Sequence, residues 1–290
     1  MIPVTVVGGF LGAGKTTLVN GLLARATRRY GVLVNDFGAV NVDAGLIAAR
    51  DGEMIALTNG CVCCGLGADL GEAVARLAAL GPEAIMVEAS GVSDPRRVAQ
   101  LAALEDGVVL DAVLVLVDAA GFLEGCADPR LADTLERQVA RADLLVINKC
   151  DLADGAALEG RLAELAPSAR VVRAVMGAVP EGLVAGSAGP ISRFEVEAPG
   201  HPFRTWHWRS DAVVDEGRLR GVVGALPRAV LRLKGVCRVG AGGGPYLVQL
   251  AGPRWSLRPW PGAVEESVLV AIGTDDLDLA ALDRCFGVLA

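Results

Sequence analysis

The chain alternates between short apolar runs and longer segments that mix alanine, leucine and arginine. Seven apolar runs rich in β-branched residues come first, at 4–7, 31–35, 54–58, 84–88, 112–118, 144–148 and 170–174. Segments of helical length follow most of them, at 16–30, 68–80, 95–104, 129–142 and 156–166. Continuous apolar strands separated by helices are typical of a parallel sheet covered on both faces. The pattern predicts an α/β domain with a doubly wound, mostly parallel sheet.

The pattern changes after residue 182. Residues 182–200 are rich in glycine, proline, serine and alanine, which is typical of a linker. Beyond them the sequence predicts further strands and two helices, the strands at 203–210, 230–239, 245–252, 254–260 and 267–273 and the helices at 215–226 and 275–289. We therefore expect a first domain over 1–185, a linker over 186–200, and a small α+β domain with an antiparallel sheet over 201–290.

Composition and charge narrow the classes of partner. The 290 residues are 52% hydrophobic and 21% charged, as in globular proteins. A net charge of −7 argues against nucleic acid as a partner, because neutralising phosphates needs a clustered excess of lysine and arginine. No apolar segment reaches the ~20 residues that span a bilayer, so no membrane partner is expected.

The seven cysteines bear on the compartment. Their number is odd, three of them lie within 61–64, and the N-terminal segment lacks the basic start of a secretory signal. Bunched cysteines without a secretory signal favour a reducing cytoplasm, where thiols bind metal or carry out redox chemistry.

A phosphate-binding motif follows the first predicted strand. Residues Gly9 to Thr16, with Gly9, Ala13 and Gly14 in the loop, fit G-x-x-x-x-G-K-[ST] and open a helix. Glycines allow backbone N–H groups to surround a phosphate, Lys15 reaches the β and γ phosphates, and the Thr16 hydroxyl holds Mg²⁺. The alternative is a glycine-rich turn with an incidental lysine.

A second nucleotide motif ends the strand 144–148. Asn148, Lys149, Cys150 and Asp151 match the N-K-x-D signature of GTP-binding proteins. The Asp151 carboxylate can accept hydrogen bonds from guanine, whereas adenine presents the wrong edge and leaves a polar group unpaired. The Lys149 stem would stack on the base. The alternative is an ordinary turn after a strand.

Acidic residues end three other strands. Glu88, in Glu-Ala-Ser-Gly, ends a strand expected beside the P-loop strand, as a Walker-B carboxylate does, and Gly91 can offer its N–H to a γ phosphate. Asp36 follows the second strand, where a switch loop could touch a metal, and Asp118 ends the strand 112–118. Each also has a simpler interpretation, as a solvated strand end, a turn residue or a cap.

The stretch Gly-Cys-Val-Cys-Cys lies between a predicted strand and a helix. Cys61, Cys63 and Cys64 can converge on one soft or borderline cation, and the helix N-terminus lowers thiol pKa values. Zinc usually takes four ligands, so the fourth would come from elsewhere. We expect this loop and the phosphate loop at adjacent strand ends. The alternatives are a redox pair of Cys61 and Cys64, or cysteines that only pack.

Taken together, these segments resemble the CobW-like family of metal-chaperone GTPases, a branch of the SIMIBI-type P-loop proteins. The resemblance rests on VTVVGGFLGAGKTTLVN, NDFGAVNVD, LTNGCVCC, VEASGVSDP and ADLLVINKCDL, and it continues through FRTWHWRSD, LPRAVLRLKGVCRV and RWSLRPW to cover about the whole chain. The C-x-C-C site between strand and helix is the most specific element.

The resemblance implies a function for these residues. It implies that Gly12, Gly14, Lys15, Thr16 and Thr17 hold the phosphates of GTP and Mg²⁺. Glu88 then takes the Walker-B role, Asn148, Lys149 and Asp151 select guanine, and the three cysteines bind Zn²⁺ or Co²⁺. Hydrolysis of GTP is linked to metal transfer to a client metalloprotein, and a homodimer that depends on nucleotide or metal is compatible with this. Together with the motifs, it makes Lys15, Thr16, Glu88 and Asp36 the candidate catalytic residues.

Some features depart from the family. Many relatives carry an acid where Ala39 and Val34 stand, and a histidine-rich run near the domain junction is absent. Slow intrinsic hydrolysis is expected because no arginine finger is evident, with Arg96 and Arg97 as candidates. Two other classes remain: a metal-independent GTP-dependent switch whose second domain binds a partner, and a phosphotransferase, which lacks an evident acceptor-site base.

Overall fold

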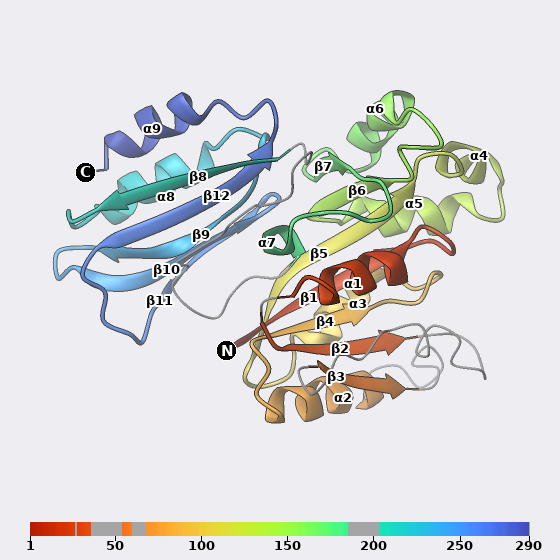
Figure 1. Ribbon diagram of the computed structural model, residues 1–290, viewed down its shortest axis with the longest axis horizontal. Helices are drawn as coiled ribbons and strands as arrows, with labels where there is room; N and C mark the ends of the chain where they lie inside the picture. Colours follow the sequence, from red (N-terminus) through yellow and green to blue (C-terminus); the bar gives the residue numbers. More distant parts are fainter. Residues whose placement is uncertain (27, 36–53, 60–67, 185–202, 290) are drawn as a thin grey trace. The chain divides into compact units, whose positions relative to one another are not determined.

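The computed structural model describes residues 1–26, 28–35, 54–59, 68–184 and 203–289. The chain divides into two compact units, Met1–Ala188 and Gly189–Ala290, which Figure 1 shows in red to green and in teal to blue. The predicted linker at 186–200 lies outside the described residues.

The first unit is built on a seven-stranded sheet whose neighbours all pair in parallel. The strand order is β3-β2-β4-β1-β5-β6-β7. Their bounds are β1 (Ile2–Gly9), β2 (Tyr30–Asn35), β3 (Met54–Asn59), β4 (Ala84–Glu88), β5 (Val108–Asp118), β6 (Leu144–Asn148) and β7 (Arg170–Arg173). All seven predicted strands are present, and the predicted parallel sheet is confirmed.

Helices cover both faces of this sheet (Figure 1). They are α1 (Lys15–Leu23), α2 (Ala68–Ala79), α3 (Pro95–Ala102), α4 (Phe122–Ala127), α5 (Ala132–Ala140), α6 (Ala156–Leu165) and α7 (Glu181–Val184). One continuous apolar cluster joins α2, α3, α5 and α6 to the inward residues of the strands. Helix α1 packs against the other face of the sheet. Its buried apolar residues are Leu18, Val19 and Leu22, and they do not belong to that cluster.

Some predicted helix bounds are wrong. The helix expected over 16–30 ends at Leu23, where the N–H groups of Arg25 and Ala26 donate to carbonyls three residues back and tighten the last turn. Tyr30 is only 2% exposed and begins β2 instead. Burial of this ring in the sheet therefore overrides the helical composition of the segment. The helix expected over 129–142 is shorter, and α4 before it was not predicted.

The second unit has a five-stranded antiparallel sheet in the order β11-β10-β9-β12-β8. Its elements are β8 (Phe203–Ser210), α8 (Glu216–Gly224), β9 (Val230–Val239), β10 (Gly244–Ala251), β11 (Arg254–Pro259), β12 (Ser267–Thr274) and α9 (Leu279–Gly287). Both helices contribute to one apolar cluster on the sheet. The rings of Trp206 and Trp208 lie 4.7 and 5.8 Å from that of Phe286. The predicted small α+β unit is confirmed.

The strand order decides which loops are neighbours at the carboxyl edge of the first sheet. Glu88 on β4 pairs with Val7 on β1, as expected of a Walker-B strand beside the P-loop strand. The expectation that the phosphate loop and the cysteine loop occupy adjacent strand ends is wrong, because β4 and β2 lie between β1 and β3. Sequence patterns identify strands but do not fix their order in a sheet.

No described helix is long and apolar enough to cross a membrane.

Candidate nucleotide site

The loop from Gly9 to Gly14 turns the chain from β1 into α1 with backbone angles that favour glycine. Gly12 has φ +74°, and a Cβ placed there would meet nothing within 4 Å, so the loop leaves open space. Gly14 has φ +100°, and a Cβ there would lie 2.3 Å from Asn148 Nδ2. Side chains larger than hydrogen are therefore excluded at Gly14 both by conformation and by its neighbour.

Lys15 and Thr16 begin α1 directly after this loop. The Lys15 ammonium group donates a hydrogen bond to the Phe10 carbonyl at 3.1 Å, which holds the lysine over its own loop. The Thr16 hydroxyl donates to Glu88 Oε1 at 2.8 Å, and Glu88 is only 3% exposed. The structure thus brings together the two residues that the sequence nominated for Mg²⁺, from α1 and β4. A hydroxyl and a carboxylate are oxygen ligands of the kind that Mg²⁺ prefers.

Asn148 joins the phosphate loop to a second loop. Its side chain donates from Nδ2 to the Ala13 carbonyl at 2.9 Å and accepts at Oδ1 from the Gly177 N–H at 2.8 Å. Asn148 is 2% exposed, so both bonds are shielded from water. The side chain acts as a structural clamp between β6, the P-loop and the loop after β7.

Lys149 leaves the sheet in the left-handed conformation, with φ 63°. Its ammonium group lies 2.6 Å from Asp118 Oδ2 at the end of the neighbouring strand β5. Burial acts to raise the pKa of Asp118, but hydrogen bonds from Lys149 and the Ala120 N–H outweigh it, so this pKa lies below its usual value. Asp118 is thus more than a cap, and it fixes where the lysine stem lies. Asp151, two residues after Lys149 in the chain, is exposed.

The loop after β7 is a part of the site that the sequence analysis missed. Met176 and Gly177 both have positive φ, at 52° and 65°. A Cβ on Gly177 would lie 2.8 Å from the Leu18 Cβ on α1, so the loop packs tightly against the helix that follows the P-loop. The available signal was a methionine-glycine pair shortly after the last parallel strand, where ligands of such sheets bind.

The loop after β4 carries Gly91 and is held from two sides. A Cβ on Gly91 would lie 2.5 Å from Leu11 Cδ2, so this glycine packs against the tip of the P-loop. On the other side, Gln138 Nε2 on α5 donates to the carbonyls of Gly91 and Ser93 at 2.9 and 3.0 Å. No sequence pattern pointed to Gln138, since nothing distinguishes a glutamine in a helix until the fold is known.

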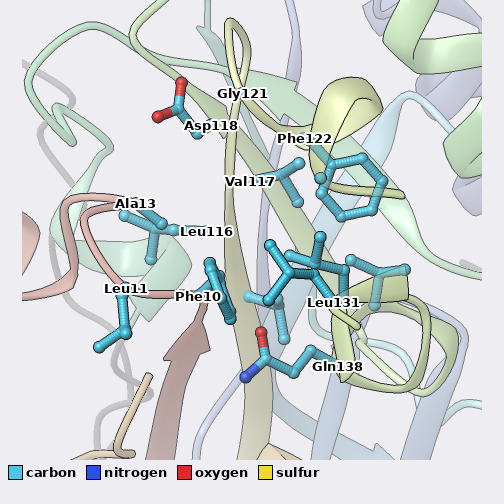
Figure 2. Close-up of a pocket in the computed structure, with 14 residues that line it drawn as sticks. Phe10, Leu11, Ala13, Leu116, Val117, Asp118, Gly121, Phe122, Leu131 and Gln138 are labelled. Carbon is cyan, nitrogen blue, oxygen red and sulfur yellow. The ribbon is translucent and has the colours of Figure 1, made fainter. Parts of the chain in front are cut away.

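A largely apolar pocket of about 140 Å³ lies behind the phosphate loop (Figure 2). Gln138 lies at one end, near Phe10, and Asp118 lies at the other end. The P-loop contributes Phe10, Leu11 and Ala13, and the remaining walls come from β5, α4 and α5. The pocket thus lies between Gln138, which holds the Gly91 loop, and Asp118, which holds Lys149.

The remaining candidate residues lie outside the described part of the chain, namely Asp36, Cys61, Cys63 and Cys64. Within the described ranges there is no cluster of three or more histidine, cysteine or acidic side chains suited to a metal. Among the cysteines outside this stretch, Cys237 is buried and Cys285 is exposed. Burial raises the pKa of Cys237 to about 12 against the opposing hydrogen bond of Ser267.

Comparison with known proteins places this site in a family. A family profile described as the CobW/HypB/UreG nucleotide-binding domain matches residues 3–173, more than half of the chain. The chain belongs to the CobW/HypB/UreG family. A second profile, the cobalamin synthesis protein cobW C-terminal domain, matches residues 203–289 of this CobW-family chain. The predicted P-loop GTPase class is thereby confirmed.

Several relatives resemble the CobW-family chain over much of its length. A protein from a Sinorhizobium species named zinc chaperone CobW is 30% identical, with 97% of this chain and 95% of the relative covered. The zinc chaperone YjiA of Escherichia coli K12 is 34% identical, with 65% and 62% covered. A crystal structure of zinc-bound YjiA GTPase from E. coli aligns with a TM-score of 0.48 and 23% identity, covering 100% of this chain and 99% of that chain.

Proposed function

We propose that this CobW-family GTPase is a metallochaperone. In this proposal a divalent metal binds Cys61, Cys63 and Cys64, and GTP hydrolysis is coupled to transfer of the metal to a client protein. Relatives that cover almost the whole chain are named zinc chaperones, which supports zinc over cobalt. We expect the protein to act in the reducing cytoplasm, where thiolates stay available to a metal.

One observation carries the proposal, the hydrogen bond of 2.8 Å between Thr16 and Glu88. It links the P-loop helix to β4, and the sheet continues from β4 to β2 and then to β3, which leads into the cysteine segment. Val34 on β2 pairs with both Glu88 and Thr58, so these three strands end almost level. A change at the phosphates can therefore pass along neighbouring strand ends towards the metal site.

The phosphate end of the proposed site uses residues from two elements. Backbone N–H groups of the loop from Gly9 to Thr17 surround the phosphates, and Lys15 turns from Phe10 to the β and γ phosphates. Thr16 and Glu88 would hold Mg²⁺, which supplies charge neutralisation on the β and γ oxygens. These residues bind and orient the phosphates, and the attacking water is positioned by the loops that carry Gly91 and Asp36.

Guanine selection is assigned to the opposite end. The exposed Asp151 carboxylate accepts from the base, and the Lys149 stem, held by Asp118 at 2.6 Å, stacks on it. Asn148 is assigned an indirect role, because its nitrogen donates to Ala13 and its oxygen accepts from Gly177, which holds the loops on either side of the base site. An adenine base would leave Asp151 facing the wrong edge, so ATP is discriminated against.

The metal end of the proposal rests on the three thiolates and on the family. Thiolates are ligands that zinc and cobalt bind well, and three protein ligands leave a position for a client residue or water. A site with an open position suits a metal that must leave. A client metalloprotein is the proposed recipient, and a nucleotide- or metal-dependent homodimer remains part of the proposal.

Elemental analysis of the purified protein tests the metal site. We expect about one equivalent of zinc with a non-hydrolysable GTP analogue bound, and loss of that zinc in a variant with all three motif cysteines changed to serine. The matched control changes the exposed Cys285 to serine, which leaves the zinc content unchanged. Zinc content that is equal in the triple variant and the native protein would refute the site, and absence of zinc from both would leave a metal-independent GTPase switch.

A further inference from the structure

The side chain of Gln138 ties α5 to the loop after β4 by two hydrogen bonds. Its amide nitrogen donates to the carbonyls of both Gly91 and Ser93, at 2.9 and 3.0 Å. The side chain is 3% exposed, so water cannot readily replace either bond. A glutamine NH₂ group has two hydrogens, and this arrangement uses both.

These bonds fix the orientation of two peptide groups. In a trans peptide the C=O of one residue and the N–H of the next point in opposite directions, and the described chain contains no cis peptide. With the Gly91 carbonyl directed at α5, the N–H of Val92 points away from α5. Gly91 itself packs against Leu11 of the P-loop on its other side. The loop is therefore held between the P-loop and α5.

We infer that Gln138 is a positioning residue for the GTPase reaction, which holds the Gly91 loop in the conformation that receives the γ phosphate. This inference rests on the proposed role of the Gly91 loop at that phosphate. The amide of Gln138 lies at one end of the pocket behind the P-loop, close to Phe10 (Figure 2). Gln138 touches neither nucleotide nor metal, and it acts through the backbone of Gly91 and Ser93.

The contacts of the Gly91 loop indicate that Gln138 favours the GTP-bound state over the GDP-bound state. The Gly91 loop rests on Leu11, and Thr16 is bonded to Glu88, so these two parts of the proposed γ-phosphate site are already assembled, while Lys15 still has to turn from Phe10. Preorganised donors lower the cost of binding because the loop does not have to be ordered afterwards. Loss of Gln138 should therefore weaken the binding of GTP and slow its hydrolysis while leaving GDP, which lacks the γ phosphate, almost unaffected.

The test compares nucleotide affinities of Gln138→Met with those of the native protein. Methionine has similar length and lacks the two donors, and its change removes two neutral hydrogen bonds. We expect the affinity for a non-hydrolysable GTP analogue with Mg²⁺ to fall roughly tenfold and the affinity for GDP to change by less than about twofold. We also expect kcat for GTP hydrolysis to be lower in the variant. Gln100→Met, at an exposed glutamine of α3, is the matched control and should change none of these.

Equal losses for GDP and the GTP analogue, no loss, or tighter binding of the analogue would each overturn the inference. If Gln138→Met does not fold, Gln138→Glu keeps the shape and replaces the donors by a carboxylate, with the same expected result.

The variant Gly91→Ala separates this inference from the proposed function. If Gly91→Ala leaves GTP and GDP binding unchanged, the proposed role of the loop fails, whereas an effect of Gly91→Ala without one of Gln138→Met refutes the role of Gln138 alone.

Discussion

Asn148 shows how one side chain can serve a site by holding its loops together. The sequence predicts a role in guanine recognition, and in the structure its nitrogen donates to Ala13 while its oxygen accepts from Gly177. We propose that Asp151 and Lys149 make the direct contacts with the base. Gly14 must be a glycine because this clamp lies directly beside it. At the scale of single residues, several motif positions are thus explained by what they hold in place.

Replacing Asn148 by alanine should destabilise the first unit even without nucleotide. The variant leaves the Ala13 carbonyl and the Gly177 N–H without their buried partner, which costs about 2 kcal/mol of the free energy of unfolding. The melting temperature should fall by about 4 to 8 °C. Circular dichroism is the suitable measurement, because all four tryptophans lie in the second unit. A melting temperature that is unchanged would contradict the clamp.

The ion pair between Asp118 and Lys149 should make the stability of the first unit depend on pH. The pKa of Asp118 is lowered in the folded protein, so its contribution is present above the unfolded pKa near 3.8 and is lost as the pH falls through the folded value. The difference in unfolding free energy between the native protein and Asp118→Asn should be constant above about pH 5 and shrink below pH 3.8.

The control for this pH profile is Asp133→Asn, which removes an exposed pair with Arg137 one helical turn away. Exposed pairs contribute little, so its difference should be small at every pH. If the difference in unfolding free energy between the native protein and Asp118→Asn grows as the pH falls, the predicted direction of the pH dependence is wrong.

At the scale of elements, the apolar runs predicted the strands well and the helix ends poorly. Strands β4, β6 and β8 coincide with their predicted bounds because each is a continuous or alternating run fixed by burial. The ends of α1 and the existence of α4 depend on contacts made only in the folded chain, such as the burial of Tyr30 in β2. The sequence did not predict the roles of Gln138 and the Gly177 loop for the same reason, because their contacts are with residues distant in sequence.

Helix α9 should be essential to the second unit. Phe286 is fully buried between Trp206 and Trp208, and Trp206 also donates to Asp283 on the same helix at 2.8 Å. Phe286→Ala should reduce the stability of this unit by about 3 to 5 kcal/mol through the cavity it leaves. The loss is measured by tryptophan fluorescence during denaturation, against Val288→Ala at an exposed position as control. Equal stability of the two variants would contradict this packing.

At the scale of the whole molecule, the order of strands matters more than any single motif. The motifs were recognisable in the sequence because each follows an apolar run. The sequence did not show which motifs are neighbours in the folded sheet. The order β3-β2-β4-β1 places the Glu88 strand next to the P-loop strand and puts β2 between Glu88 and the cysteine segment. The coupling we propose must therefore pass through the loops that follow β4 and β2, which carry Gly91 and Asp36. It does not run directly from the phosphates to the cysteines.

The most direct test of this account is the affinity for Zn²⁺ measured with GDP bound and with a non-hydrolysable GTP analogue bound. Coupled sites affect each other by 1 to 3 kcal/mol as a rule, so we predict that zinc binds about 5 to 150 times more tightly with the GTP analogue. The difference should vanish in the variant with Cys61, Cys63 and Cys64 changed to serine. Equal zinc affinities of the native protein in the two nucleotide states would contradict the account.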